Sequence, residues 1–443
     1  MDCQAGNLTG VRGAGKLSLW PRDRAVYSRP LRTTHLHPTK TALHTSSNIA
    51  GLQPSATVAV AALARELRAQ GRDIVDLSAG EPDFDTPAFI RSAAIHAIEH
   101  GATRYAAAPG IQPLREAIAR DLARRTGREI DPAGVVVTAG AKQAIFNACF
   151  VLFGPGDRVL FPAPYWTSYP DIVRLARAEP VPVAGDPDRG YKVTPALLDA
   201  ASDDRTRGLI LNSPCNPTGA VYTREELAAI YRWAAGRGVW IISDEIYSRV
   251  CFTQDTAPGL LELPEASLDR AVIVDGASKT FAMTGWRIGF SYSSAELSRH
   301  MAALQSHITT SAATPSQYAA LAAYRAEGEH AAELRAMSET FRRRRDHVVS
   351  LFQELLPGTE FVYPDGAFYL FFRVDGFFRD GVNSAVELCR KLIEEAGVAL
   401  VPGAAFGDDR FVRLSFAASE DTLTEGIRRI ARTLAPGSAG GTD

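Results

Sequence analysis

The chain has 443 residues, of which 46% are hydrophobic and 22% are charged, and it carries a formal net charge of −2. This length exceeds what one hydrophobic core usually fills, so the composition indicates a globular protein of at least two domains. The near-neutral charge gives no electrostatic basis for binding nucleic acid or a membrane, and no apolar run approaches the ~18 residues of a membrane span. The five cysteines are scattered without CxxC spacing, which argues against disulfides or a metal site and favours a cytoplasmic protein.

Residues 1–50 differ from the rest of the chain. They are basic, poor in acidic residues and rich in Ser and Thr, and they hold no sustained apolar period. Three interpretations fit this composition: an organellar transit peptide, a disordered tail, or translated sequence upstream of the true start. The Ala- and Arg-rich body of the chain favours the last two. We therefore expect residues 1–50 to be a disordered or targeting extension outside the fold.

Two glycine-containing loops follow predicted strands in the first third of the remaining chain. Residues 79–87 form a turn-rich loop after a short strand at 74–77, and backbone amides near Gly80 could hold a carboxylate because glycine permits close approach. A strand at 135–138 runs into a small-residue turn at 139–143 that opens a helix, a geometry in which free amides receive a phosphate. An ordinary strand-to-helix connection and a tight packing turn are the respective alternatives.

Each of the next three strands is followed by a residue that could bind a ligand. Trp166 follows a strand at 158–161 and could stack on a flat heteroaromatic ring, although core packing is the commoner use of tryptophan. Asn216 follows a strand at 209–213 and lies between Pro214 and Pro217, which would hold its amide stiffly as a donor; a plain turn is the alternative. Asp244, after a strand at 239–242, is costly to bury unless a cation pairs with it or it caps a helix.

The stretch 278–289 provides a lysine, Lys279, and eight residues later an arginine, Arg287, between apolar strands at 271–274 and 288–292. A lysine in a buried loop is desolvated, so its pKa falls and its amine becomes a nucleophile for carbonyls. The planar fork of an arginine suits a phosphate. An amine that attacks an aldehyde beside a phosphate clamp is what pyridoxal phosphate (PLP) requires. A surface lysine on a glycine-rich turn is the alternative.

Strands and helices alternate from about 135 to 292, which predicts a mostly parallel sheet with helices on both faces. Ligands of such sheets bind at the C-terminal ends of the strands. The candidates in this span lie at those ends: Ala141, Trp166, Asn216, Asp244, Tyr247 and Lys279.

Helices are predicted over 315–356, with a basic run at 342–345 that we expect to form a solvated or interface face. A smaller α/β region follows, with strands near 367–372, 398–402 and 412–416 and a helix over 384–396. Arg413 lies inside the last strand, which is expensive unless an anion pairs with it. Either a protein carboxylate forms an internal salt bridge with it, or it is a bidentate clamp for a substrate carboxylate.

Seven stretches together resemble the motifs of the fold-type I, PLP-dependent class I aminotransferases, in the bacterial aspartate-aminotransferase-like subgroup Ib. They are residues 54–60, 79–87, 164–170, 216–219, 243–247, 278–289 and 412–415. The resemblance covers about residues 51–435 and implies an α/β fold in which a large domain has a mostly parallel seven-stranded sheet flanked by helices. It also implies an N-terminal arm with part of the small domain at 51–91, the large PLP-binding domain at 92–330, the small domain at 331–435, and a disordered tail at 436–443.

The resemblance assigns cofactor roles to five residues. Lys279 matches the Schiff-base lysine, which also shuttles the proton at the substrate Cα. Asp244 matches the aspartate that keeps the pyridinium nitrogen protonated. Tyr247 and Asn216 match donors to the phenolate oxygen of the cofactor, and Trp166 matches the aromatic residue that stacks on its ring.

The same resemblance assigns phosphate, substrate and partner contacts. The phosphate cup would be made by Arg287, Ala141 and Lys142. Tyr105 matches a tyrosine that reaches the phosphate of the neighbouring subunit, which implies a homodimer with shared active sites. The substrate-binding set would be Arg413 as the α-carboxylate clamp with Gly80, Trp166 and Asn216. No metal is expected.

Two positions depart from the family pattern. Gly276 stands where many relatives carry a phosphate-binding serine, and Gln53 stands where relatives that use aspartate often have lysine. No residue can be assigned to a second substrate carboxylate. We expect an aminotransferase that passes the amino group of an L-amino acid, with aspartate as one candidate, to a 2-oxo acid such as 2-oxoglutarate in a ping-pong cycle. The alternatives are a Cβ–S lyase or an aromatic or branched-chain aminotransferase on the same fold, and, more remotely, a non-catalytic PLP-fold binding module.

Overall fold

The computed structural model describes residues 45–49, 52 and 54–434. The expectations for the extension at 1–50 concern mostly residues outside this part, as do those for Gln53 and for the tail at 436–443. The described residues from Ser47 onward belong to one compact unit. No helix among them is long and apolar enough to cross a membrane.

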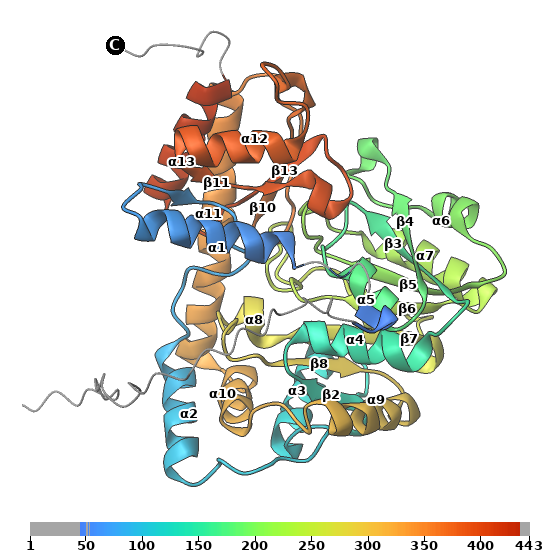
Figure 1. The fold of residues 1–443 in the computed structure, drawn as a ribbon. Helices are drawn as coiled ribbons and strands as arrows, with labels where there is room; N and C mark the ends of the chain where they lie inside the picture. Colours follow the sequence, from blue (N-terminus) through green and yellow to red (C-terminus); the bar gives the residue numbers. More distant parts are fainter. Residues whose placement is uncertain (1–44, 50–51, 53, 435–443) are drawn as a thin grey trace, which may run out of the picture. The chain divides into compact units, whose positions relative to one another are not determined.

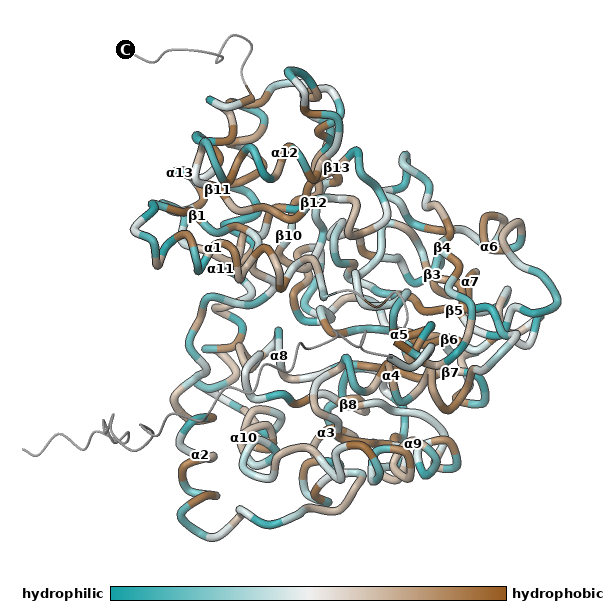
Figure 2. The backbone as a smooth tube through the Cα atoms, in the orientation of Figure 1, coloured by the Kyte–Doolittle hydropathy of each residue, from teal (hydrophilic) through white to brown (hydrophobic). Residues whose placement is uncertain are grey.

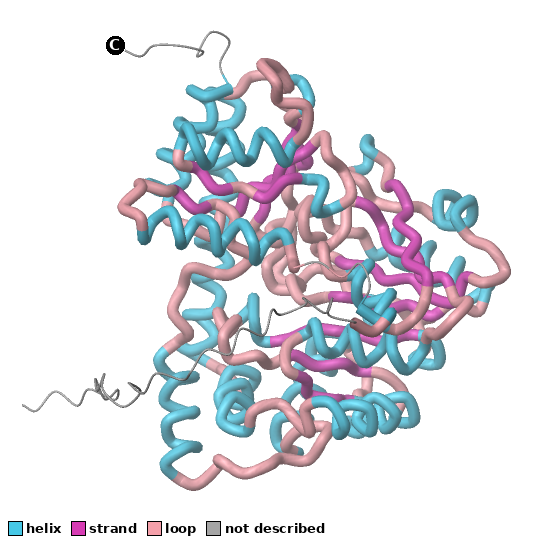
Figure 3. Tube along the Cα trace, in the orientation of Figure 1, coloured by secondary structure: helices cyan, strands magenta, loops and turns pink. Residues whose placement is uncertain are grey.

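A seven-stranded sheet organises the larger part of the fold (Figures 1 and 3). Its strands are β2 (Val135–Thr138), β3 (Arg158–Ala163), β4 (Glu179–Ala184), β5 (Thr206–Asn212), β6 (Trp240–Asp244), β7 (Ala271–Gly276) and β8 (Gly289–Tyr292), in the spatial order β2-β8-β7-β6-β5-β3-β4. β8 pairs antiparallel with both neighbours, and the other described pairings in this sheet are parallel. The predicted fold class is confirmed.

Alternate residues of the strands face two separate cores, which explains the unbroken apolar runs in the sequence. Leu209, Leu211 and Ile241 pack with α3 (Gln112–Thr126), α7 (Arg224–Arg237) and α10 (Thr314–Tyr324) on one face. Ile210 and Ile242 pack with α4 (Ala141–Leu152), α5 (Tyr169–Leu175) and α9 (Ala295–Ile308) on the other. Figure 2 shows hydrophobic residues concentrated around β5 and β6. The sheet is therefore covered on both faces, and its strand ends are left for a site.

One strand of this sheet was not predicted. β4 contains Pro180 and Pro182 and lies at the edge of the sheet, next to β3 alone. Proline removes a backbone donor and is tolerated at such an edge, so a strand with two prolines gives a weak sequence signal.

The second, four-stranded sheet is antiparallel and has the order β12-β13-β10-β9. Its strands are β9 (Phe361–Val362), β10 (Tyr369–Arg373), β12 (Val401–Pro402) and β13 (Phe411–Ser415). β1 (Val75–Asp76) pairs in parallel with β11 (Val398–Ala399), so the start and the end of the described chain lie side by side (Figure 1). This region packs against α1 (Ala56–Ala69), α11 (Gly328–Leu355), α12 (Ala385–Lys391) and α13 (Glu420–Leu434). The domain limits at 91 and 330 stay predictions.

The helical region after β8 differs from the prediction in one respect. The helices predicted over 315–356 are α10 and α11, separated at residues 325–327. The solvated face expected for the basic run at 342–345 is formed only in part, because Arg343 is exposed whereas Arg344 and Arg345 are buried. Arg344 makes two bonds to Asp83, from Nη1 to Oδ1 at 2.6 Å and from Nη2 to Oδ2 at 2.9 Å. The expectation of a solvated face is wrong for these two arginines, because Arg344 binds the loop that follows β1 and Nη1 of Arg345 donates to the Pro364 carbonyl oxygen at 2.8 Å.

Candidate functional site

A cavity of about 590 Å³ lies at the C-terminal ends of β5, β6 and β7, between the two sheets. Ten of the predicted site residues line it: Gly80, Ala141, Lys142, Trp166, Asn216, Asp244, Tyr247, Lys279, Arg287 and Arg413. Tyr105 does not line it, and its side chain is 91% exposed. Residues more than 300 positions apart are thus brought together, while their chemical roles stay predictions.

Lys279 belongs to α8 (Ala277–Thr280), a helix of four residues directly after β7, rather than to the loop that we expected. Its Nζ donates to the carbonyl oxygen of Gly80 at 2.5 Å and lies 5.7 Å from the ring centroids of Tyr247 and Phe368. Burial lowers the pKa of Lys279 to about 8. An appreciable fraction of the amine is therefore neutral and nucleophilic near pH 7.

Gly276, the departure noted in the sequence, has a packing reason. A Cβ at this position would lie 2.8 Å from Cα of Gly289 and 3.0 Å from the carbonyl oxygen of Ile288. β7 and β8 approach each other too closely here for a side chain. Ser278, which the sequence reasoning missed, lines the cavity immediately before the lysine and offers a hydroxyl instead.

Asp244 ends β6 and is buried. Its Oδ2 accepts a hydrogen bond from the Tyr169 hydroxyl at 2.6 Å, and its Oδ1 accepts one from the Ile246 backbone amide at 3.3 Å. Burial raises the pKa of Asp244 to about 6, against these two bonds. A cation in the cavity beside this carboxyl would lower that pKa again, as a protonated ring nitrogen does.

Arg413 projects from β13 with only 1% of its surface exposed. Its Nη1 donates to Asn216 Oδ1 at 3.0 Å and its Nη2 to the Ser78 carbonyl oxygen at 2.8 Å, while Nε has no partner. Among the described residues no carboxylate forms an ion pair with it, so the internal salt bridge that we considered is not formed. A buried cation that is held only by neutral groups is suited to receive an anion.

Arg287 and the start of α4 line the cavity together and offer groups that suit a phosphate. Gly140 precedes α4 at φ +83°, and a Cβ there would lie 2.3 Å from Nη2 of Arg287. Glycine therefore lets the guanidinium lie against the start of the helix, whose first amides have no intrahelical acceptor. Arg287 donates to the Thr284 carbonyl oxygen at 2.7 Å, which orients it.

Lys142 and Trp166 lie next to each other in the lining of the cavity. The Nζ of Lys142 lies 5.0 Å from the centroid of the Trp166 ring. Burial and the neighbouring Arg287 lower the pKa of Lys142. No carboxylate of the described chain pairs with this amine. Arg65 and Arg68 of α1, which the sequence reasoning did not single out, also line the cavity.

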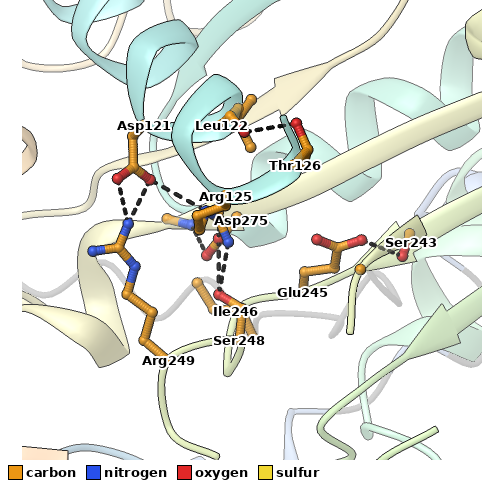
Figure 4. Close-up of polar contacts among 12 residues, drawn as sticks. Asp121, Leu122, Arg125, Thr126, Ser243, Glu245, Ile246, Ser248, Arg249 and Asp275 are labelled. Carbon is orange, nitrogen blue, oxygen red and sulfur yellow. Dashed lines mark hydrogen bonds and ion pairs between the residues drawn. The ribbon is translucent and has the colours of Figure 1, made fainter. Parts of the chain in front are cut away.

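A buried cluster of ion pairs holds the loop after β6, which runs from Asp244 to Arg249 (Figure 4). Arg125 of α3 lies 3.3 Å from Asp121 and 3.3 Å from Asp275 of β7, and Arg249 also pairs with Asp121. The Ser248 hydroxyl donates to Asp275 at 3.1 Å. These contacts hold α3, β7 and the loop after β6 in one arrangement. Sequence reasoning missed the cluster, because Asp275 lies 150 residues from Arg125 and Arg249 lies 128 residues from Asp121.

The cavity residues fit PLP. The buried carboxyl of Asp244 could pair with a cationic ring nitrogen, and the Lys279 amine, with its lowered pKa, could react with a carbonyl. The Trp166 ring suits a flat ring, and Arg287 at the start of α4 suits a phosphate.

Comparisons with known proteins agree with this arrangement. The family model for aminotransferases of class I and II matches residues 72–430. The chain is 40% identical over 395 residues to an aspartate aminotransferase of Streptomyces avermitilis, covering 88% of this chain and 96% of the relative. It is 42% identical over 390 residues to an aspartate/prephenate aminotransferase of Thermus thermophilus, covering 88% and 98%. The solved structure of the Thermus thermophilus aspartate aminotransferase with maleate superposes with a TM-score of 0.83 at 40% identity, covering 88% of this chain and 99% of that one.

Proposed function

Because this chain belongs to the class I and II aminotransferases and is a PLP-dependent enzyme of fold type I, we propose that aspartate is its amino donor and a 2-oxo acid such as 2-oxoglutarate its acceptor. The observation that carries the proposal is Arg413, a buried cation without a counter-ion that lines the same cavity as the Lys279 amine. An α-carboxylate on the arginine would bring the neighbouring amino group into that cavity.

Lys279 and Asp244 have complementary tasks in this proposal. When bound, PLP supplies an aldehyde that takes up the amino group and a ring that accepts the electrons released at the substrate Cα. Lys279 removes and returns the proton at that carbon, because its lowered pKa lets the amine act as a base near neutral pH. Asp244 holds a proton at the ring nitrogen, and Tyr169 keeps its carboxyl in place.

Asn216 and Tyr247 are the proposed donors to the ring oxygen. The Oδ1 of Asn216 already accepts from Arg413, so its Nδ2 group remains to donate. The backbone amide of Asn216 donates to Asn212 Oδ1 at 2.8 Å, which fixes the residue after β5. This arrangement links the carboxylate clamp to a cofactor donor through one amide side chain.

The choice of aspartate rests on charge. A dicarboxylate needs a second cation, and three candidates line the cavity: Lys142, Arg65 and Arg68. Lys142 has its amine over Trp166 and no acidic partner among the described residues, whereas Arg68 is engaged with the Ile74 carbonyl oxygen at 2.9 Å. The relatives named above are aspartate or aspartate/prephenate aminotransferases, which supports the same donor.

We further propose a homodimer that acts in the cytoplasm. The 91% exposed side chain of Tyr105 is consistent with a contact to the cofactor phosphate of a neighbouring subunit. The four cysteines in the described part of the chain are all free thiols, which suits a reducing compartment.

A donor screen tests the proposed function. The purified holoenzyme is given each amino acid in turn with 2-oxoglutarate, and formation of glutamate is measured. We expect aspartate to be used fastest and Lys279→Ala to be inactive with every donor. Preference for aromatic or branched donors would reject aspartate, and acceptor-independent release of pyruvate and ammonia from cysteine or cystathionine would reject transamination in favour of a lyase.

A further inference from the structure

Tyr369 is a tyrosine of the site to which the sequence reasoning gave no role. It starts β10, is buried, and lines the cavity with Tyr247 and Arg413. β10 and β13 pair antiparallel, with Tyr369 opposite Ser415 and Phe371 opposite Arg413. Opposite residues share a face, so Tyr369 and Arg413 are diagonal neighbours on the same side of the sheet. The centre of the Arg413 guanidinium lies 4.2 Å from the centroid of the Tyr369 ring.

The hydroxyl of Tyr369 lies 2.8 Å from the hydroxyl of Tyr247. The two phenols have two protons between them, and the bond between them uses one. The second proton is left for another acceptor, and which phenol keeps it depends on the direction of the bond. The Arg413 guanidinium lies over the Tyr369 ring at 4.2 Å, whereas the cation over the Tyr247 ring, the Lys279 amine, lies at 5.7 Å. The nearer cation polarises the Tyr369 hydroxyl more, which makes it the better donor. Tyr369 then donates to Tyr247, and the free proton belongs to Tyr247.

We propose that Tyr369 is a positioning residue that turns the Tyr247 hydroxyl outward as a donor to the cofactor and links this donor to the Arg413 carboxylate clamp. The inference rests on the proposed role of Tyr247 and deepens it. A hydroxyl that accepts one hydrogen bond becomes a stronger donor in the next, since bonds in a chain polarise one another. The ring of Tyr369 meanwhile supports the guanidinium that receives the substrate.

The loop after β1 is shaped around this tyrosine. A Cβ on Gly80 would lie 3.3 Å from the Tyr369 hydroxyl, so glycine lets the loop pass close to it. The charged groups around the two phenols come from other elements: Arg413 on β13, Asp244 on β6, Lys279 on α8 and Glu81 on the loop. All of them are retained when only a phenolic oxygen is removed, so that change isolates the contribution of the hydroxyl pair.

The test is a pH titration of the bound cofactor's absorbance in the holoenzyme without substrate. A donor on the ring oxygen competes for it with the proton on the Lys279 nitrogen, so it lowers the pH midpoint at which that nitrogen deprotonates. We expect Tyr247→Phe to raise the midpoint, Tyr369→Phe to raise it less, by about 0.5 pH unit, and the double variant to match Tyr247→Phe. Tyr231→Phe is the matched control, because its buried hydroxyl accepts from the Ser267 amide at 2.8 Å, away from the cavity, and its midpoint should stay that of the wild type.

Three results would overturn the inference. If Tyr247→Phe shifts the midpoint and Tyr369→Phe does not, Tyr369 has no such role, while the proposed function of Tyr247 stands. If the two shifts add in the double variant, the tyrosines act separately. If neither shifts it, the assignment of Tyr247 fails as well. Thermal unfolding of each variant separates these results from misfolding.

The ring and the hydroxyl of Tyr369 can also be separated by kinetics. Tyr369→Phe keeps the ring beneath Arg413, so KM for the amino donor should change less than about twofold while kcat falls. Tyr369→Leu removes the ring and should raise KM roughly 5- to 10-fold. An unchanged KM in Tyr369→Leu would show that the ring does not support the clamp.

Discussion

Replacing Arg413 by methionine should lower catalytic activity strongly and change the free energy of unfolding little. The substitution removes a charge that is buried, that has no carboxylate partner, and whose Nε has no hydrogen-bond partner. If the guanidinium receives the substrate carboxylate, two charge-assisted bonds are lost at about 1.5–3 kcal/mol each. The fall in kcat/KM should then be roughly 10²- to 10⁴-fold.

The same substitution should cost little folding free energy. An apolar side chain of similar volume relieves an uncompensated buried charge, and such exchanges are often neutral or stabilising. Two acceptors lose their donor, Asn216 Oδ1 and the Ser78 carbonyl oxygen. Both border the cavity, where water can reach them, so we expect a net change within about 1 kcal/mol.

Arg344→Met is the matched control. Arg344 is also a buried arginine, 7% exposed, but it forms a two-bonded pair with Asp83. Asp83 is 32% exposed, so water partly compensates its loss, and we expect a destabilisation of about 1–3 kcal/mol. Both variants are compared with the wild type by urea unfolding and by steady-state kinetics with aspartate. A larger loss of stability for Arg413→Met than for Arg344→Met, or an unchanged kcat/KM, would refute the reasoning.

Three further variants test other parts of the site. Lys279→Ala should abolish transamination while PLP still binds, which absorbance after gel filtration can show; retained turnover would move the catalytic base elsewhere. In the cofactor-free protein Asp244→Asn should be more stable than the wild type at pH 7, by about 3 kcal/mol, but not at pH 4. The variant gains at pH 7 because burial raises the folded-state pKa of Asp244 from 3.8 to about 6, so the wild type loses stability as the pH rises between these values. A stability difference between variant and wild type that is the same at both pH values would contradict this reasoning. Gly140→Ala places a Cβ 2.3 Å from Arg287 at φ +83° and should weaken PLP binding roughly 10-fold, measured by fluorescence titration, whereas Gly285→Ala, with nothing within 4 Å, should not.

The sequence was sufficient for features that depend on local pattern. Continuous apolar runs predicted β2, β5, β6 and β7, because both faces of these strands are buried. The site candidates followed from their position directly after such runs. β4 was missed because its prolines mask an edge strand, and the burial of Arg344 was missed because its partner, Asp83, is 261 residues away.

Tyr369 and Tyr169 show the same limit within the site. Each stands in an apolar or aromatic stretch where a core role is the ordinary expectation. Their hydroxyls find Tyr247, 122 residues away, and Asp244, 75 residues away, only in the folded chain. Sequence reasoning therefore found the groups that are proposed to contact ligands, and it missed the groups that hydrogen-bond to two of them.

The three ionisable groups at the centre of the cavity share one property that ties the fold to the chemistry. Asp244, Lys279 and Arg413 are each held by neutral dipoles rather than by opposite charges: the Tyr169 hydroxyl, the Gly80 carbonyl oxygen, and Asn216 with the Ser78 carbonyl oxygen. An oppositely charged side chain beside each group would offset the effect of burial on its pKa and would occupy the position that a ligand could take. In the proposed function, a cationic ring nitrogen would pair with Asp244, a carbonyl carbon would react with the Lys279 amine, and a carboxylate would pair with Arg413. Because such partners bind the folded state alone, cofactor and substrate should each raise the midpoint of thermal unfolding, and Arg413→Met should lose only the increment due to substrate.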